Sequence, residues 1–226
     1  MDTAGLEGER EQLASASRRL AAEGLVLGTA GNLSIRAGDR VAVTPTGAQL
    51  AELEPAHVTI VDLEGGVVEG ALAPTSELDL HLGVYRRYDA GAVVHTHAPM
   101  ATALSCVLDE VPCVHYSMLL LGGTVRVAPY ATFGTPELAE SVVAALDGRT
   151  AALMANHGAI AYGGSLDQAV ELSLLLEWAC TVYWRAAALG EPRVLGEEER
   201  GAVLAAATRR GYGTTRPVEA TAEEER

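Results

Sequence analysis

Hydrophobic side chains recur at helical spacing in several stretches of this 226-residue chain. Leu13, Ala16 and Leu20 fall on one face of the first such stretch, and Gly24 follows as a suitable helix end. Pro136 opens a later stretch in the first-turn position that proline favours. The spacing predicts helices over residues 7–23, 75–88, 135–146, 166–189 and 197–210, and one that begins near residue 99.

Short runs of β-branched and aliphatic residues, punctuated by Gly and Pro, separate the helical stretches. Such runs are typical of strands, and they lie at residues 32–36, 40–44, 58–63, 92–97, 125–130, 151–155 and 159–162. Helices that mix with short strands and hairpin-like joins favour an α/β sandwich with a mainly antiparallel sheet over a doubly wound parallel sheet.

The composition excludes several kinds of chemistry. All 16 residues in the Lys+Arg count are arginine, so the chain has no lysine. A Schiff base with a carbonyl substrate needs a lysine amine, and a Walker-type phosphate loop needs its lysine. The net charge of -14 argues against nucleic acid as a partner.

The sequence also predicts where the protein acts. No apolar run approaches the ~18 residues of a membrane span, so no membrane partner is expected. The N-terminus is acidic and polar, unlike a secretory signal. The 3 cysteines form no C-x-x-C pair, which is typical of reduced thiols. We therefore expect a cytoplasmic protein.

Three histidines are candidate metal ligands. His95 and His97 lie two residues apart in a predicted strand, where side chains point to the same side about 6.6 Å apart. The pair alone is equally typical of polar residues on an edge strand. His157 adds a third nitrogen, and Gly158 beside it could supply a turn with positive φ that directs the histidine inward. Three protein ligands with an open position are typical of a catalytic zinc site.

Glu77 lies where a helix is predicted to begin. One interpretation makes Thr75 or Ser76 the helix cap and places Glu77 in the first turn, where the helix dipole favours a carboxylate. The other makes Glu77 a carboxylate beside the metal site that accepts a proton from carbon. The two interpretations are compatible. His81, one helical turn later, is expected to form an i,i+4 pair with Glu77.

Short loops of glycines and hydroxyl residues lie beside the predicted strands, at residues 28–32 and 44–47. Together with Thr75 and Ser76 they offer backbone N–H groups and small donors that could hold an anion. Ordinary turn chemistry explains most such loops equally well. Because lysine is absent, a phosphate here would rest on these donors or on an arginine.

Considered together, six motifs are specific: G-T-A-G-N-L-S (28–34), T-P-T-G (44–47), P-T-S-E (74–77), H-T-H-A (95–98), V-P-C-V-H-Y (111–116) and N-H-G (156–158). In order and approximate spacing the chain resembles the class II aldolase/adducin family over about residues 8–190, and within it the L-fuculose-1-phosphate aldolases. The resemblance implies an α/β/α sandwich around a mainly antiparallel central sheet. It implies a homotetramer with sites at subunit interfaces. It also implies a catalytic domain over residues 1–195, with a C-terminal helix and flexible acidic tail of the same domain over residues 196–226.

The resemblance also implies roles for individual residues. His95, His97 and His157 match metal ligands, and Glu77 matches an acidic residue that ligates the metal and then acts as base. Tyr116 matches a tyrosine that protonates the aldehyde oxygen in a neighbouring subunit's site. Substrate and phosphate positions are matched by Gly31, Asn32, Thr46, Gly47, Thr75 and Ser76, and by Tyr212, which corresponds to a tail tyrosine that closes over the substrate.

The activity implied by this resemblance is cleavage of a ketose 1-phosphate into dihydroxyacetone phosphate and an aldehyde through a zinc-stabilised enediolate, with Mn²⁺ or Co²⁺ as alternatives to Zn²⁺. An L-ribulose-5-phosphate 4-epimerase, or another sugar-phosphate lyase or dehydratase of the same fold, is the alternative. The epimerase subgroup has Asp where this chain has Glu77, which favours the aldolase. A non-catalytic adducin-like scaffold is disfavoured, because such proteins lack the metal histidines.

Overall fold

The computed structural model describes residues 6–210 and residue 213. The chain divides into two compact units, Met1–Val194 and Leu195–Arg226. The first unit holds a sheet, and the second contributes one helix, α6 (Glu197–Arg210). Three glutamates in the first turn of α6 and two arginines in its last turn complement the helix dipole. Among the described residues, no helix combines the length and the apolar character needed to cross a membrane.

Within the described residues, nine strands form one sheet in the order β4-β3-β2-β1-β5-β9-β8-β7-β6. Every neighbouring pair is antiparallel except β7 and β8, so the predicted mainly antiparallel sheet is confirmed. The strands are β1 (Asn32–Ala37), β2 (Arg40–Val43), β3 (Thr59–Asp62), β4 (Val67–Glu69), β5 (Ala92–Thr96), β6 (Glu110–Val111), β7 (Val125–Ala128), β8 (Ala151–Met154) and β9 (Gly158–Gly163).

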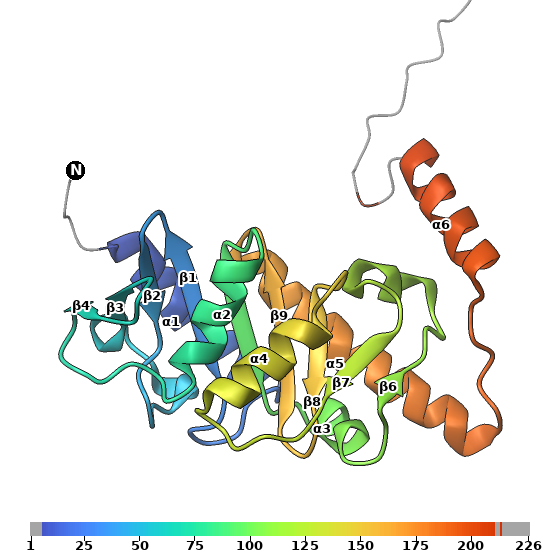
Figure 1. Ribbon diagram of the computed structural model, residues 1–226, viewed down its shortest axis with the longest axis horizontal. Helices are drawn as coiled ribbons and strands as arrows, with labels where there is room; N and C mark the ends of the chain where they lie inside the picture. Colours follow the sequence, from blue (N-terminus) through green and yellow to red (C-terminus); the bar gives the residue numbers. More distant parts are fainter. Residues whose placement is uncertain (1–5, 211–212, 214–226) are drawn as a thin grey trace, which may run out of the picture. The chain divides into compact units, whose positions relative to one another are not determined.

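Helices cover both faces of the sheet (Figure 1). The helices α2 (Leu78–Arg87) and α4 (Pro136–Ala145) lie on one face and contact each other. On the other face, α5 (Leu166–Leu189) packs along β5 and β9 and contacts both α1 (Glu7–Ala22) and α3 (Pro99–Ser105). The expected α/β/α sandwich is therefore confirmed. Its apolar core between the sheet and the first pair of helices includes Val41, Val93, Leu82, Val142 and Ile160.

The predicted elements differ from the structure mainly at their ends. The helix expected from Thr75 begins only at Leu78, because Pro74 forms a β-bridge with Pro45 and the backbone N–H of Thr75 donates to the Thr44 carbonyl. The sequence analysis missed β4 and β6, which have three and two residues and lie at the two ends of the strand order. Strands this short show no measurable alternation, and all three residues of β4 are exposed.

Pairing of β5 with β9 leaves no room for a side chain at Gly158. A Cβ at this position would overlap the carbonyl oxygen of Thr96, and it would lie 3.4 Å from ring carbons of His95 and His97. Because the nearest obstacle is backbone, the two strands would have to separate.

We therefore expect Gly158→Ala to lower the free energy of unfolding by about 1–3 kcal/mol, the usual range for overpacking. Gly8→Ala is the matched control, because a Cβ on Gly8 meets nothing within 4 Å and the residue lies in α1. That control should leave stability unchanged or raise it by up to about 1 kcal/mol. Urea unfolding followed by circular dichroism measures both, and equal stability of the two variants would contradict the close approach.

Candidate active site

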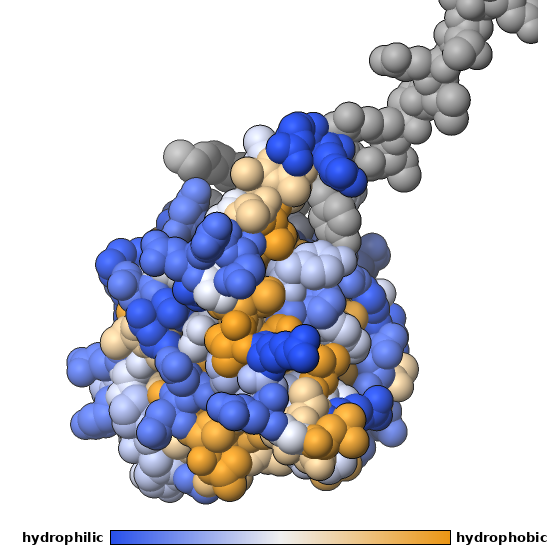
Figure 2. All heavy atoms as spheres, turned by 90° about the vertical axis from the view of Figure 1, so that its right-hand side faces the viewer, coloured by the Kyte–Doolittle hydropathy of each residue, from blue (hydrophilic) through white to orange (hydrophobic). Residues whose placement is uncertain are grey.

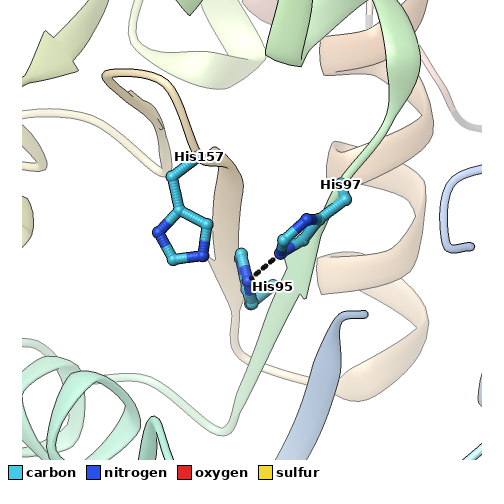
Figure 3. A group of neighbouring side chains, drawn as sticks. All are labelled: His95, His97 and His157. Atoms are coloured by element: carbon cyan, nitrogen blue, oxygen red, sulfur yellow. Dashed lines mark hydrogen bonds between the residues drawn. The ribbon is translucent and has the colours of Figure 1, made fainter. Parts of the chain in front are cut away.

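Three histidine rings converge from two segments that are far apart in the sequence (Figure 3). His95 lies in β5, His97 follows the end of that strand, and His157 lies in the turn between β8 and β9. One ring nitrogen from each lies within 4.8 Å of the others. The structure therefore brings together all three histidines that the sequence pattern singled out.

Hydrogen bonding prepares the His95 ring to bind a cation. Its Nδ1 lies 2.9 Å from the Ala159 carbonyl oxygen, which can only accept, so Nδ1 donates this hydrogen bond and Nε2 is the atom that faces the other histidines and Glu77. Nε2 of His95 lies 3.0 Å from Nε2 of His97. Nitrogens at 2.0–2.1 Å from a tetrahedral zinc are about 3.3 Å apart. The donor set and its spacing thus fit a divalent metal of this kind.

The protonation of the histidines also suits a metal. Burial and the nearby rings of His95 and His157 lower the pKa of His97 to about 4. Burial, followed by the charge of His95, also lowers the pKa of His157. Both rings are therefore neutral near pH 7, and a neutral imidazole is the form that binds metal.

Backbone strain before His157 aims its side chain. Asn156 has φ of 56°, the one positive φ at a residue other than glycine in the part of the chain that the structure describes. The expectation that Gly158 supplies this turn is wrong, because the left-handed residue is Asn156, a type that tolerates this conformation. Gly158 is instead needed for the close approach to Thr96.

Glu77 lies beside the histidines. Its Oε2 is 3.1 Å from Nε2 of His95, and its Oε1 is 3.4 Å from Nε2 of His157. The Asn32 amide donates to Oε2 at 3.0 Å. Glu77 occupies the N-cap position of α2 but makes no side-chain capping bond, so the interpretation that places it in the first turn is wrong. Thr75 Oγ1 accepts from the Glu77 backbone N–H at 3.3 Å and helps to fix the position of this residue.

The site holds the Glu77 carboxylate ionised. Burial alone would raise its pKa, but the charge of His95 and hydrogen bonds from His95 and Asn32 outweigh burial and keep the pKa below its ordinary range. A carboxylate beside this group of histidines completes a set of donors for a cation, or supplies a base.

A pocket of about 270 Å³ opens beside these groups. Its wall includes Glu77, His97 and His157 and also six residues that the sequence marked for phosphate or substrate, namely Gly31, Asn32, Thr46, Gly47, Thr75 and Ser76. Within the described part of the chain, no arginine lines this pocket. An anion there would therefore be held by backbone N–H groups, hydroxyls and an amide.

Two aromatic residues of the pocket, Tyr130 and Phe133, were missed by the sequence analysis. Both are about two-thirds exposed, at 66% and 65%. The signal that could have found them is a pair of aromatics in an irregular segment just before the Thr135 helix cap, in a chain with only 4% aromatic residues. They give the pocket mouth an apolar side.

The two predicted tyrosines lie elsewhere. Tyr116 begins the short helix η3 (Tyr116–Leu121), is 42% exposed, and is absent from the described wall of the pocket. Its ring packs on His115 at a centroid distance of 4.4 Å, and His115 also contacts Trp178 of α5. Tyr212 lies outside the described residues.

His81 does not pair with Glu77 as expected. Its Nε2 lies 2.5 Å from Asn32 Oδ1 and its Nδ1 lies 2.7 Å from Ser34 Oγ, so it contacts β1 across the helix–sheet interface. Burial, followed by the charge of His95, lowers the pKa of His81 to about 3. This ring is therefore a neutral member of the core.

Comparison with known proteins identifies relatives that cover most of the chain. Residues 11–184 match the family described as Class II Aldolase and Adducin N-terminal domain. A 5-methylthioribulose-1-phosphate/5-deoxyribulose-1-phosphate aldolase of Rhodospirillum rubrum is 43% identical over 197 residues, covering 86% of this chain and 89% of that protein. The L-fuculose phosphate aldolase of Escherichia coli K12 is 42% identical over 184 residues, covering 80% and 85%. A solved structure of an L-fuculose 1-phosphate aldolase superposes with a TM-score of 0.86 at 35% identity, covering 92% of this chain and 98% of that one.

The low pKa of His81 predicts a dependence of stability on pH. In the unfolded chain a histidine titrates near pH 6.5, so between about pH 6.5 and pH 3 the unfolded state binds a proton that the folded state rejects. Stability from this group is present above pH 6.5 and is lost as the pH falls. From pH 7.5 to pH 5.5 His81 should account for a loss of roughly 1 kcal/mol.

His81→Gln removes this titration and keeps a donor and an acceptor. Urea unfolding of both proteins at pH 7.5 and pH 5.5 measures the effect, and the variant should lose less stability than the wild type over this interval. An equal loss in both would show that His81 is protonated in the folded state.

Proposed function

The chain belongs to the class II aldolase and adducin family and is an aldolase, and we propose that it cleaves a ketose 1-phosphate into dihydroxyacetone phosphate and an aldehyde. The observation that carries this proposal is the placement of a buried carboxylate, Glu77, within 3.4 Å of the nitrogens of both His95 and His157 at one end of a pocket. Hydroxyl, amide and glycine groups suited to a phosphate line the same pocket.

Class II aldolases depend on a metal, and the three histidines of this chain are the residues that would hold it. We propose zinc, for which three imidazoles and an open position are typical, with Mn²⁺ or Co²⁺ as alternatives. When bound, such a metal acts as a Lewis acid on substrate oxygens. Because the chain has no lysine, an amine cannot serve as the electron sink.

Glu77 would move the proton at carbon. Its Oε1 is buried and has no hydrogen-bond partner among the described residues, while Oε2 is held by Asn32. One oxygen is thus fixed and the other is available to accept a proton, which is the arrangement a general base needs. The ionised state of Glu77 prepares it for this role.

The phosphate of the substrate would occupy the glycine and hydroxyl side of the pocket. Gly31 and Gly47 both have positive φ, at 91° and 70°, which exposes backbone N–H groups in the loops. Thr46, Thr75 and Ser76 add hydroxyls. We propose that these groups and Asn32 bind the phosphate, and that no arginine among the described residues of this chain takes part.

The aromatic part of the pocket wall suits an apolar end of the sugar. Tyr130 and Phe133 line the mouth together with Ala131. The relative from Rhodospirillum rubrum is named for 5-methylthioribulose 1-phosphate and 5-deoxyribulose 1-phosphate, whose ends lack a hydroxyl. We propose a ketose 1-phosphate with such an end as substrate, with L-fuculose 1-phosphate as the second compound to test.

A panel of ketose 1- and 5-phosphates, scored for cleavage against epimerisation, tests this function. We expect release of dihydroxyacetone phosphate from 1-phosphates, loss of that activity on chelation, and its return with Zn²⁺, Mn²⁺ or Co²⁺. His95→Ala should lose bound metal and cleavage together, since the ring supplies one of three nitrogens.

His57→Ala is the control, because His57 ends the short helix η2 (Pro55–His57), its Nδ1 accepts from the backbone N–H of Glu54, and it is absent from the described wall of the pocket. It should keep both metal and activity. Epimerisation of a 5-phosphate without cleavage would replace the aldolase proposal, and a purified protein with no divalent metal would contradict it.

We also propose a homotetramer in which Tyr116 completes the site of a neighbouring subunit. Tyr116, Leu120, Trp178 and Trp184 are all between 42% and 64% exposed, and Trp178 contacts the same histidine as Tyr116. Figure 2 shows hydrophobic side chains, mixed with charged ones, on the side of the molecule that lies to the right in Figure 1. An apolar surface of this kind supports contact with a second copy of the chain.

Mixed oligomers test this shared site. Glu77→Gln and Tyr116→Phe should each be nearly inactive alone. The first variant lacks the base, and the second lacks the acid that protonates the aldehyde oxygen. Co-expressed with different tags at equal amounts, they should recover about a quarter of wild-type activity, since one site in four would combine an intact Glu77 with an intact Tyr116 from the neighbour.

The matched control mixes Glu77→Gln with His95→Ala. These two residues belong to one chain's site, so no mixed oligomer contains an intact pair and no activity should return. If the first mixture also stays inactive, Tyr116 does not act across a subunit interface.

A further inference from the structure

A line of buried polar side chains lies between β1 and α2 and leads from the interior of the protein to Glu77. Asn32 and Ser34 are two residues apart on β1 and face the helix, and His81 and Tyr85 are four residues apart on α2 and face the strand. All four are at most 6% exposed. The spacing of two residues on the strand matches the spacing of four residues on the helix, so the side chains from β1 and α2 contact each other alternately across the interface.

The contacts form one continuous line. Tyr85 OH lies 2.7 Å from Ser34 Oγ, Ser34 Oγ lies 2.7 Å from His81 Nδ1, and His81 Nε2 lies 2.5 Å from Asn32 Oδ1. Asn32 Nδ2 then donates to Glu77 Oε2 at 3.0 Å. The line therefore ends on the carboxylate of the candidate active site.

Hydrogen-bond chemistry gives this line one direction. A carboxylate can only accept, so the NH₂ of Asn32 must face Glu77 and its carbonyl must face His81. His81 Nε2 must then carry a proton, and in a neutral ring Nδ1 is left as an acceptor. Ser34 donates to that nitrogen and accepts from Tyr85. Every proton in the line points toward Glu77.

Burial keeps these groups from changing charge. The pKa of His81 falls to about 3, and burial raises the pKa of Tyr85 above its ordinary value. Both groups therefore stay neutral near pH 7, and the order of donors is stable.

We propose that Tyr85, Ser34 and His81 are positioning residues that lock the Asn32 amide in the orientation that donates to Oε2 of Glu77, so that Oε1 is the oxygen available to the substrate. The catalytic consequence rests on the proposed function. Without the donor from His81, the Asn32 amide can rotate and place its carbonyl against the carboxylate. Misplacement of a catalytic group by 1 Å can cost as much as about 100-fold in rate.

The tautomer of His81 tests the order of donors without any activity measurement. In protein labelled with ¹⁵N-histidine, the nitrogen chemical shifts separate a protonated ring nitrogen from an unprotonated one, and the His81 signals are assigned by their loss in His81→Gln. We expect a neutral ring with the proton on Nε2 between pH 6 and pH 8. A proton on Nδ1, or on both nitrogens, would overturn the proposal.

Kinetics of two variants at position 81 test the consequence. His81→Leu cannot donate to Asn32, so kcat for cleavage should fall roughly tenfold or more, while KM and bound metal stay within about twofold. His81→Gln can donate at one end and accept at the other, so it should recover most of kcat. If KM rises and metal content falls together with kcat, or if Gln rescues nothing, His81 has only a structural role.

Ser34→Ala provides a second route in case His81→Leu does not fold. It removes the donor to His81 and should also lower kcat without a change in KM. Ser173→Ala is its matched control, because Ser173 is equally buried but bonds to the Ala169 carbonyl within α5; its kcat should equal that of the wild type. A wild-type chain that cleaves no sugar phosphate would remove the proposed function, and the tautomer measurement would still decide the order of the hydrogen bonds.

Discussion

The antiparallel pairing of β5 with its two neighbours is the constraint on which the site depends. On one side Asn32 of β1 lies directly opposite His95, and on the other Thr96 lies opposite Ala159 of β9. Backbone hydrogen bonds of the sheet thus bring the amide and the histidines to the same end of three strands. The close approach at Gly158 continues this pairing into the turn that carries His157. Secondary structure therefore determines the geometry of the donors more directly than any side-chain contact does.

Electrostatics impose a second constraint. A chain with net charge -14 repels an anionic substrate at long range, and no arginine lines the pocket in the described residues. Binding of a sugar phosphate must therefore come from short-range donors and from a cation held by the histidines. This explains why glycines with positive φ, such as Gly31 and Gly47, and hydroxyl residues line the same pocket as Glu77. The absence of lysine excludes Schiff-base chemistry, and it also accounts for the glycine and hydroxyl donors in the part of the pocket where we place the phosphate.

Sequence patterns predicted the long elements and the three histidines because these depend on local periodicity and on residue chemistry. The patterns failed where contacts between elements decide. His81 has a carboxylate one turn away, yet it bonds to β1, because the sheet presents Asn32 and Ser34 at matching spacing. The positive φ falls on Asn156 and not on Gly158, since the strand pairing requires the glycine for space. Short edge strands and the aromatic mouth of the pocket likewise have no periodic signal.

The polar line from Tyr85 to Glu77 is costly for a core. Burying an unpaired amide or hydroxyl costs about 1–3 kcal/mol in proteins, and an apolar set of similar volume would pack between β1 and α2 without that risk. The cost is offset only because each donor meets an acceptor, which leaves a single consistent order of protons. Such a network restricts the motion of the side chain at its end, which here is Glu77. Since it ends on Glu77, a buried carboxylate beside the histidines, its most direct physical effect is to fix that carboxylate, and fold stability alone does not explain its composition.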